Sequence, residues 1–284
     1  MTAELPAIDP EYVEARRVLL DALEALGPHR KAVVLVGAQA IYLRVGEGNL
    51  QVAPFTSDGD LALNPDALAD EPLLAEALLS AGFSLAVKPG TWARHAVQID
   101  LMVPSAIGGP GRRSARLGPH GAEVARKAKG LEAALFDFDL LSLAALDPAD
   151  ARTITVAVAG LSALLVAKLH KLAEREGTPA RWSAKDGLDI LRILQGAELA
   201  QLGATLVGLE AHPVAGAVTS EARPLLRRLF ATPSGHGADM AVRASLGLEE
   251  PATIRSACAA LATELLRVWE ANPAEAPSQP APLG

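Results

Sequence analysis

The chain has 284 residues, a length that suits one large domain or two small ones and can bury a sizeable core. Hydrophobic residues make up 50% of it and charged residues 21%, a balance that excludes an intrinsically disordered chain. The formal net charge of −7 argues against a protein that coats nucleic acid without specificity, although it permits a local basic patch.

Cysteine usage and hydropathy narrow the class further. Cys258 is the single cysteine, so an internal disulfide is excluded, and no Cys/His cluster has the spacing of a zinc site. The acidic N-terminal stretch lacks the basic and apolar regions of an export signal. Every apolar run of about 18 residues is interrupted by a charge, so no membrane span is predicted. We therefore expect a cytoplasmic protein.

The first half of the chain alternates predicted helices and strands. Apolar residues recur at helical spacing over 11–26, and an apolar run at 32–36 predicts a buried strand before a helix at 38–45. Asn64-Pro65 is a helix-start signal. The expected order continues with a strand at 57–63, a helix from 65 to about 81, and strands at 83–88 and 96–103. This order predicts a sheet layered with helices.

The second half is predicted to be mostly helical. Glycine, proline and arginine crowd residues 104–120, which indicates a long surface loop, and residues 153–158 alternate like one more strand. The helices expected after that strand span 161–176, 182–195, 197–210, 220–231 and 252–270. We predict an α+β fold: a mixed sheet with flanking helices in residues 1–158, a C-terminal helical bundle in 159–272, and a disordered tail in 273–284.

Two aspartates are the first candidates for chemistry. Asp58 and Asp60 stand two residues apart in the predicted strand 57–63, so both side chains are expected on one face. Adjacent carboxylates repel, and burial makes them costly without a counter-charge. Mg²⁺ suits them, because it commonly binds one or two carboxylates together with substrate phosphates. The alternative is a solvated hairpin turn, since Asp58-Gly59 is also a strong turn dipeptide.

Asp100 lies in the apolar strand predicted at 96–103, where a lone carboxylate is unusual. It could face solvent or pair with Arg94. If its strand lies beside that of the first two aspartates, the three carboxylates form a site suited to two metal ions and to phosphoryl displacement. Upstream, Gly37 would let a phosphate approach the backbone N–H groups of the next helix, although any strand-to-helix turn can need a glycine.

In this order, Gly37 after an apolar strand, Asp58-Gly59-Asp60, and Asp100 resemble the signature of polymerase-beta-type nucleotidyltransferases. Farther along, Ala167-Lys168-Leu169, Arg175 and the run 185–190 (Lys-Asp-Gly-Leu-Asp-Ile) resemble the C-terminal motif of the AbiEii family of bacterial nucleotidyltransferase toxins. The MenT toxins of mycobacteria belong to that group. Two details depart from the usual pattern: Ala38 follows Gly37 where glycine or serine is common, and Gly59 replaces an apolar residue.

The resemblance implies a nucleotidyltransferase-type sheet and an enzyme that transfers a nucleoside monophosphate from an NTP and releases pyrophosphate. It implies Mg²⁺ held by Asp58 and Asp60, with Asp100 as the third acid. It also implies nucleotide contacts at Gly37, Thr56, Ser57, Lys168 and Lys171. Asp189 would complete the site from the helical half of the chain. In characterised relatives the acceptor is the 3′ end of tRNA, which blocks translation, and a cognate antitoxin neutralises the enzyme.

Physical arguments bear separately on the helical-half residues. Lys168 and Lys171 share one face of the predicted helix 161–176, and the alternative is a solvated cationic stripe favoured by the helix dipole. Asp186 and Asp189 share a face of the next helix. They could simply pair with Lys185 or Arg192, and an exposed pair of that kind is worth well under about 1 kcal/mol.

A basic run offers a candidate RNA contact. Against the single acid Glu123, it contains six basic residues: Arg112, Arg113, Arg116, Arg126, Lys127 and Lys129. The run is +5 locally, which leaves −12 for the remainder of the chain. Such a patch could grip an RNA backbone, or it could be a solvated basic loop.

The leading hypothesis is therefore a magnesium-dependent nucleotidyltransferase toxin that acts on tRNA. One alternative is an enzyme of the same chemistry that modifies a small hydroxylated molecule such as an aminoglycoside. Another is a catalytically silent binding protein on the same scaffold. The sequence does not name the preferred nucleotide, the particular tRNA, the antitoxin or the oligomeric state.

Overall fold

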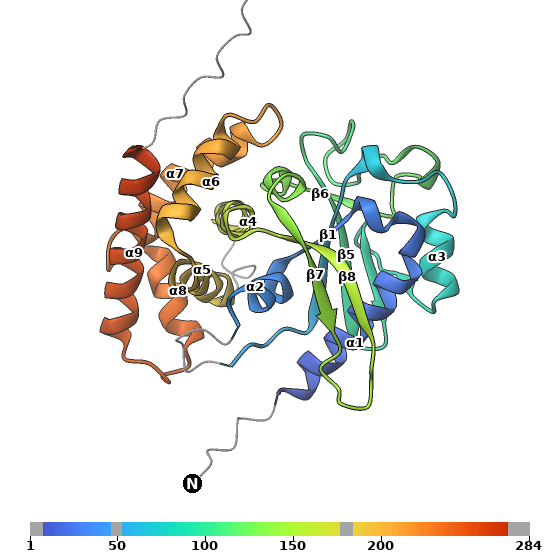
Figure 1. Cartoon of the computed structure of the whole chain (residues 1–284), viewed down its shortest axis with the longest axis horizontal. Coiled ribbons are helices and arrows are strands. Elements are labelled where there is room, and N and C mark those ends of the chain that lie inside the picture. The colour runs from blue at the N-terminus through green and yellow to red at the C-terminus, as the bar shows by residue number, and fades with distance from the viewer. Residues whose placement is uncertain (1–7, 47–52, 177–183, 272–284) are drawn as a thin grey trace, which may run out of the picture.

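The computed structural model describes residues 8–46, 53–176 and 184–271. A central sheet separates two sets of helices (Figure 1). Helices α1 (Pro10–Ala25) and α3 (Leu74–Ser80) lie on one side, and α2 (Gly37–Val45) and α4 (Leu161–Arg175) on the other. Beyond α4 lie α5 (Ala184–Gly196), α6 (Leu199–Glu210), α7 (Gly216–Phe230), α8 (His236–Ala244) and α9 (Pro251–Ala271).

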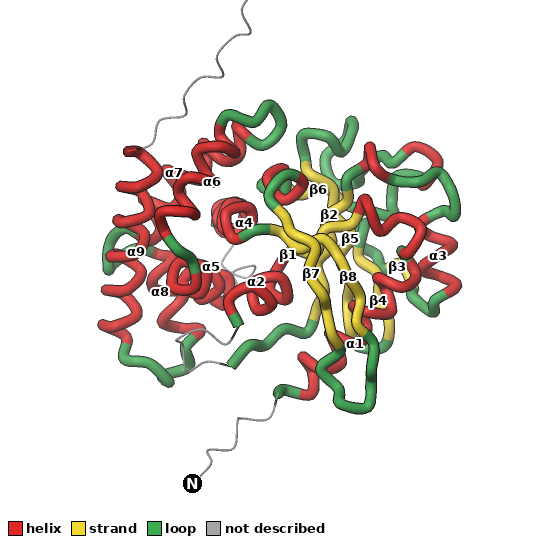
Figure 2. The backbone as a smooth tube through the Cα atoms, in the orientation of Figure 1, coloured by secondary structure: helices red, strands yellow, loops and turns green. Residues whose placement is uncertain are grey.

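The sheet is mixed, and its strands form one continuous layer (Figure 2). The strands are β1 (Val33–Val36), β2 (Asp58–Leu63), β3 (Ser84–Leu85), β4 (Thr91–Arg94), β5 (Val97–Pro104), β6 (Arg126–Ala128), β7 (Phe138–Ala144) and β8 (Thr153–Ala159). Their order is β3-β4-β5-β2-β1-β8-β7, and β6 pairs with the second half of β5. The predicted α+β class, a mixed sheet followed by a helical bundle, is confirmed.

Strand β2 occupies the middle of the sheet. It pairs antiparallel with β1 and parallel with β5, and the two registers oppose Asp60 to Val36 on one side and to Asp100 on the other. The predicted strand at 57–63 is thus confirmed, and the hairpin-turn alternative for Asp58-Gly59 is wrong, because both residues lie within β2. Burial on both faces explains the unbroken apolar run of β1, whose four residues are all buried.

Local signals account for several element ends. The Asp9 side chain accepts a hydrogen bond from the backbone N–H of Glu11, and Pro10 fills the first position of α1. Asn64 caps a helical turn as predicted, but that turn is a short 3₁₀ helix, Pro65–Ala67. The predicted helix from 65 to 81 is therefore wrong in its first half. Pro72 cannot donate a backbone hydrogen bond inside a helix, so α3 starts after it.

Within the described residues, the sequence patterns missed three strands, one α-helix and the short 3₁₀ helices Gly27–Ala32, Gly118–His120 and Glu132–Leu135. Strand β4 lies within the predicted turn region between 88 and 96, while β6 and β7 lie where no strand was predicted. Helix α8 was also missed, in a stretch rich in glycine. The predicted tail 273–284 lies outside the described residues, as do residues 182 and 183 of one predicted helix.

The sheet and the helical bundle follow one another along the chain. β8 ends at Ala159 and α4 starts at Leu161, which is close to the predicted boundary at 158/159. Helix α2 of the first half contacts both α4 and α5, so the two parts share a packed interface. The division into two domains stays a prediction.

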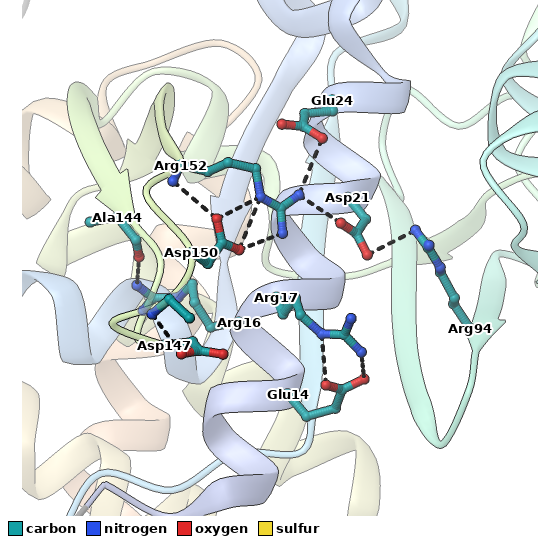
Figure 3. Close-up of polar contacts among 11 residues, drawn as sticks. Glu14, Arg16, Arg17, Asp21, Glu24, Arg94, Ala144, Asp147, Asp150 and Arg152 are labelled. Atoms are coloured by element: carbon teal, nitrogen blue, oxygen red, sulfur yellow. Dashed lines mark hydrogen bonds and ion pairs between the residues drawn. The ribbon is translucent and has the colours of Figure 1, made fainter.

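Ion pairs connect α1 to strand β4 and to the β7–β8 hairpin (Figure 3). Arg152, from the β7–β8 hairpin, binds Asp21 of α1 at 2.7 Å and Asp150 at 2.6 Å. Arg94 of β4 binds the other oxygen of Asp21 at 2.8 Å. One carboxylate on α1 thus links two elements that are far apart in the sheet order. Within the described residues no helix is both long and apolar enough for a membrane span.

Candidate active site

The two aspartates of β2 lie on the face of the sheet that carries α2 and α4. Asp60 stands beside Asp100 in the β2–β5 register, and Asp58 is two residues upstream on the same face. Gly59 between them points to the opposite face, where an added Cβ would meet Ile99 and Leu19 of α1. The predicted convergence of the three positions on neighbouring strands is therefore present in the backbone.

Gly37, the first residue of α2 after β1, lies against the Asp60 carboxylate. Its φ of +71° lies in the left-handed region that favours glycine. A Cβ placed on Gly37 would lie 2.1 Å from Asp60 Oδ2, so no larger residue fits without moving that carboxylate. The glycine predicted as a phosphate contact thus has a defined structural task, which is to leave room for Asp60.

Asp60 is a carboxyl group in an unfavourable place for a negative charge. Burial raises its pKa above the usual value, and the nearby Asp58 carboxylate raises it further. The positive charge of Lys171 acts to lower the pKa of Asp60. A bound divalent cation would relieve both the burial cost and the repulsion, so Asp58 and Asp60 fit a magnesium ion.

Asp58 is exposed, and among the described residues its carboxylate accepts a hydrogen bond from Thr56. The buried Thr56 hydroxyl donates to Asp58 Oδ1 at 2.5 Å, so Thr56 orients this carboxylate. Ser57 is exposed. The backbone carbonyl of Asp58 accepts a hydrogen bond of 2.9 Å from Gln39 Nε2, a contact that sequence reasoning missed.

Asp100 is held by cations and a hydroxyl. Arg126 Nη2 lies 2.6 Å from Asp100 Oδ2, Lys88 Nζ lies 3.3 Å from the same oxygen, and Thr91 Oγ1 donates to Oδ1 at 2.6 Å. Burial alone would raise the pKa of Asp100, but the Arg126 charge and the Thr91 hydrogen bond outweigh it and leave the pKa lowered. The alternative pairing with Arg94 is wrong, because Arg94 binds Asp21.

The three carboxylates do not form a ready metal centre. Across 8–46, 53–176 and 184–271, no group of three or more His, Cys, Asp or Glu side chains is arranged to hold a metal ion. The Asp100 carboxylate is instead engaged by Arg126 and Lys88. The three predicted acids therefore lie on neighbouring strands, and their role as metal ligands stays a prediction.

A cleft of about 690 Å³ opens over Asp60 and Gly37, between the sheet and α4. Its lining carries eight cationic side chains and two acidic ones, Asp60 and Glu174. The cationic residues are Lys88, Arg113, Arg126, Lys127, Lys129, Lys168, Lys171 and Arg175. Ion pairs to Asp100, Asp186, Asp189 and Glu221 offset part of this charge. The positive charge that remains in this concave site favours anions such as phosphates.

Lys168 joins the cleft to the helical bundle. Its Nζ lies 2.8 Å from Asp186 Oδ1 and 2.7 Å from Asp189 Oδ2, and all three side chains are buried. Burial would lower the pKa of Lys168, but the two carboxylates hold it well above the usual value. The solvated-stripe alternative is therefore wrong for Lys168. Asp189 also lies 3.6 Å from Arg192, a pairing that the sequence had left open.

Two further lysines of this region keep more exposure. Lys171 lines the cleft one turn beyond Lys168, and its side chain remains 38% exposed although it lies 3.2 Å from Asp186. Lys185 lies over the rings of Tyr42 and Phe55, with its ammonium 5.9 Å and 5.7 Å from their centres. Burial lowers the pKa of Lys185.

The predicted RNA contacts divide into two groups. Arg113, Arg126, Lys127 and Lys129 line the cleft, whereas Arg112 and Arg116 are exposed outside its lining. Lys127 Nζ donates to the carbonyls of Gly109 and Gly111 and so holds the preceding loop, and Lys129 pairs with Glu221 of α7 at 2.5 Å. The basic run is thus partly strand β6 and partly loop.

Sequence reasoning missed the residues that hold the aspartates in place. Thr91 and Arg126 contact Asp100 because β4 and β6 both pair with β5, and neither strand was predicted. Gln39 gave a weak signal, a polar side chain in the first turn of a buried helix.

Comparison with known proteins gives little. No family model matches the chain, and no curated protein matches it. One solved structure, provisionally described as a nucleotidyltransferase from H. pylori, aligns over 93% of this chain and 98% of its own. The identity is 12% and the TM-score 0.46, values too low to support a functional conclusion.

Proposed function

We propose that the chain is a magnesium-dependent nucleotidyltransferase. The acceptor hydroxyl would lose its proton to solvent as its oxygen attacks the α-phosphorus of an NTP, the bond from that phosphorus to the bridging oxygen would break, and pyrophosphate would leave. The observation that carries this proposal is the cationic cleft, whose lining includes Gly37 and the Asp60 carboxylate that lies against it. A pocket of this charge and volume suits a triphosphate, and the half-buried Asp60 gives it a carboxylate that could bind a cation.

Each residue then has a distinct task. Asp58 and Asp60 would hold Mg²⁺, which supplies neutralisation of the phosphate oxygens and activation of the acceptor oxygen. Thr56 orients Asp58. Lys171 and Arg126 line the cleft and would balance charge that develops on the leaving pyrophosphate. Lys168, fixed between Asp186 and Asp189, would position α4 and its neighbouring cations.

The finer proposal concerns the acceptor and the biological role. We propose transfer to the 3′ end of tRNA by a toxin that a cognate antitoxin neutralises, as the AbiEii resemblance implies. The cations at the cleft support an RNA acceptor, because Arg113 lines the cleft and Arg112 and Arg116 extend the positive charge outside it. A small cationic acceptor such as an aminoglycoside is disfavoured by the same charge.

One observation favours a second candidate, a catalytically silent binding protein. Asp100 is neutralised by Arg126 and Lys88, so the third acid is not available as placed. In this case the cleft would bind a polyphosphate or an RNA end without turnover.

The test is incubation of the full chain with each labelled NTP and Mg²⁺, with either total tRNA or a panel of small hydroxylated acceptors. Extension of tRNA 3′ ends by mass analysis, abolished by Asp60→Asn and by EDTA, is the expected result. Labelling only of small molecules would replace the tRNA acceptor. NTP binding without any transfer, unchanged in Asp60→Asn, would favour the silent binder.

A further inference from the structure

Arg16 of α1 is a buried arginine, and its hydrogen-bond acceptors in the described part of the chain are all uncharged. Its side chain is 4% exposed. Nη1 donates to the carbonyl of Ala144 at 2.9 Å (Figure 3), Nη2 to the hydroxyl of Tyr12 at 3.0 Å, and Nε to Gln39 Oε1 at 2.7 Å. Burying a guanidinium without a carboxylate is costly. A buried charge that lowers stability and lies beside a candidate site indicates a functional role for Arg16.

Gln39 connects Arg16 to β2, the strand that carries Asp58 and Asp60. It is 1% exposed, and its Nε2 donates to the backbone carbonyl of Asp58 at 2.9 Å. Arg16 can only donate, so Gln39 Oε1 must face Arg16 and the amide N–H must face Asp58. The guanidinium thus fixes which end of the amide reaches the strand.

The hydrogen bond between Gln39 and Asp58 takes the place of a backbone pairing that β1 does not provide. The β1–β2 register runs from Val33 opposite Leu63 to Val36 opposite Asp60, where β1 ends and the chain turns into α2. Asp58 lies two residues beyond that last pair, so β1 offers it no partner. Gln39, from the first turn of α2, supplies the donor with its side chain.

We propose that Gln39 is a positioning residue, oriented by Arg16, that extends the β1 side of the ladder to Asp58 and so fixes the Asp58 carboxylate relative to Asp60. This inference rests on the proposed function, in which Asp58 and Asp60 bind the same Mg²⁺ ion and must be held at a fixed distance from each other. Without this hydrogen bond, Asp58 would keep its β5 neighbour Gln98 on one side only.

Gln39→Glu separates positioning from folding. The glutamate keeps an acceptor for Arg16 and adds the opposite charge, so the melting temperature is expected to equal or exceed that of the wild type. It loses the N–H that Asp58 needs and sets an oxygen against that carbonyl. We expect kcat to fall about 10- to 100-fold with little change in KM for NTP, because a misplaced ligand lowers the rate more than binding.

Two readouts do not require turnover. Hydrogen exchange of the peptide that spans 53–60 is expected to accelerate in Gln39→Glu, and the dissociation constant for Mn²⁺, measured by paramagnetic resonance, is expected to rise. Ile254→Val, a core variant in α9, is the stability control: it lowers the melting temperature and leaves exchange at 53–60 unchanged. Gln39→Leu, which removes both contacts, is expected to show the same exchange change with a lower melting temperature.

The failures of the two proposals are distinguishable. If the wild-type chain transfers no nucleotide, the proposed function fails, while exchange and Mn²⁺ binding still decide the role of Gln39. If Gln39→Glu keeps the exchange rate, Mn²⁺ affinity and kcat of the wild type, Gln39 is not a positioning residue.

Discussion

Asp60 and Asp100 are direct neighbours across the parallel β2–β5 ladder, yet their carboxyl groups carry opposite pKa shifts. Burial and the Asp58 charge raise the pKa of Asp60. For Asp100, the Arg126 charge and the Thr91 hydrogen bond outweigh burial and lower the pKa. Groups of one chemical type in two environments can take two roles, here the proposed cation ligand Asp60 and the ion-paired Asp100.

The Arg126–Asp100 pair is open to a double-mutant cycle. Arg126→Met leaves a half-buried carboxylate without its closest cation and is expected to lower the free energy of unfolding by about 1–3 kcal/mol. Asp100→Asn removes the charge that Arg126 faces. Because each variant breaks the same contact, the double variant is expected to cost less than the sum of the two in urea unfolding. Additive effects would contradict a stabilising role for this pair.

Gly37→Ala tests the contact with Asp60. Its Cβ would overlap Asp60 Oδ2, and its positive φ would add a strain of roughly 1–2 kcal/mol. Gly247→Ala is the matched control, because Gly247 also has a positive φ, +76°, but nothing lies within 4 Å of its added Cβ. We expect both variants to lose stability in thermal unfolding and only Gly37→Ala to lose Mn²⁺ affinity. Equal Mn²⁺ affinity in both would show that Gly37 does not shape the site.

How much of this site the sequence predicts depends on how local each signal is. The period-two spacing of Asp58 and Asp60 predicts a shared face, and the apolar run around Asp100 predicts a strand, because both follow from backbone geometry. Strand β6 has the sequence Arg-Lys-Ala and carries no β pattern. It forms because the second half of β5 has an open edge, a tertiary effect that no local window contains.

Strand β7 illustrates the same limit in a different way. Most of its residues are exposed, Leu140 to 70%, so its apolar side chains do not mark a buried face. The buried cluster of Lys168, Asp186 and Asp189 shows a related limit. Spacing places the acids on one helix face, but only the packing of α4 against α5 brings the lysine between them.

Lys168 and Lys171, one helical turn apart, are predicted to differ sharply. Lys168→Met leaves Asp186 and Asp189 buried without their shared cation, and removing one partner from a buried ion pair costs about 3–5 kcal/mol. Lys171→Met removes a 38% exposed partner and is expected to cost less than about 1 kcal/mol. Guanidinium unfolding measures both. If Lys168→Met were as stable as Lys171→Met, the buried cluster would have no structural role.

The same pair of variants addresses the cleft. Lys171 lines the cleft, and its positive charge acts to lower the pKa of Asp60. Because Lys171→Met removes a cation that could bind phosphate, we expect it to weaken NTP binding while the fold stays intact. Isothermal titration with a non-hydrolysable NTP measures this. Unchanged NTP affinity would remove Lys171 from the phosphate-binding set.

His29 predicts a pH dependence of stability. Burial lowers its pKa, and the neighbouring His120 ring, 5.2 Å away and edge-on, adds to this effect. The unfolded chain therefore binds a proton more readily, near its ordinary pKa of about 6.5, so this contribution to stability is complete above that pH and lost as the pH falls below it. The melting temperature is expected to drop between about pH 7.5 and 5.5, in the range where unperturbed histidines titrate.

His29→Gln retains a donor for the Pro72 carbonyl, which His29 Nε2 contacts at 2.8 Å, but cannot take up a proton. Its melting temperature is expected to change less over this pH range than that of the wild type. His95→Asn, at an exposed position with a positive φ that asparagine tolerates, is the control. An equal pH response in the wild type and His29→Gln would exclude His29 as the source.

The two groups of basic residues allow the RNA and nucleotide sites to be separated. Arg112 and Arg116 are exposed outside the cleft, so neutralising both to glutamine is expected to weaken tRNA binding and leave NTP binding unchanged. Each lost phosphate contact lowers the slope of log affinity against log salt by roughly 0.7 to 0.9. Arg113→Gln, inside the cleft, is expected to weaken both ligands. If the salt slope for tRNA stayed at its wild-type value in the double variant, these two arginines would not contact RNA, and an acceptor small enough to be held within the cleft would become the better proposal.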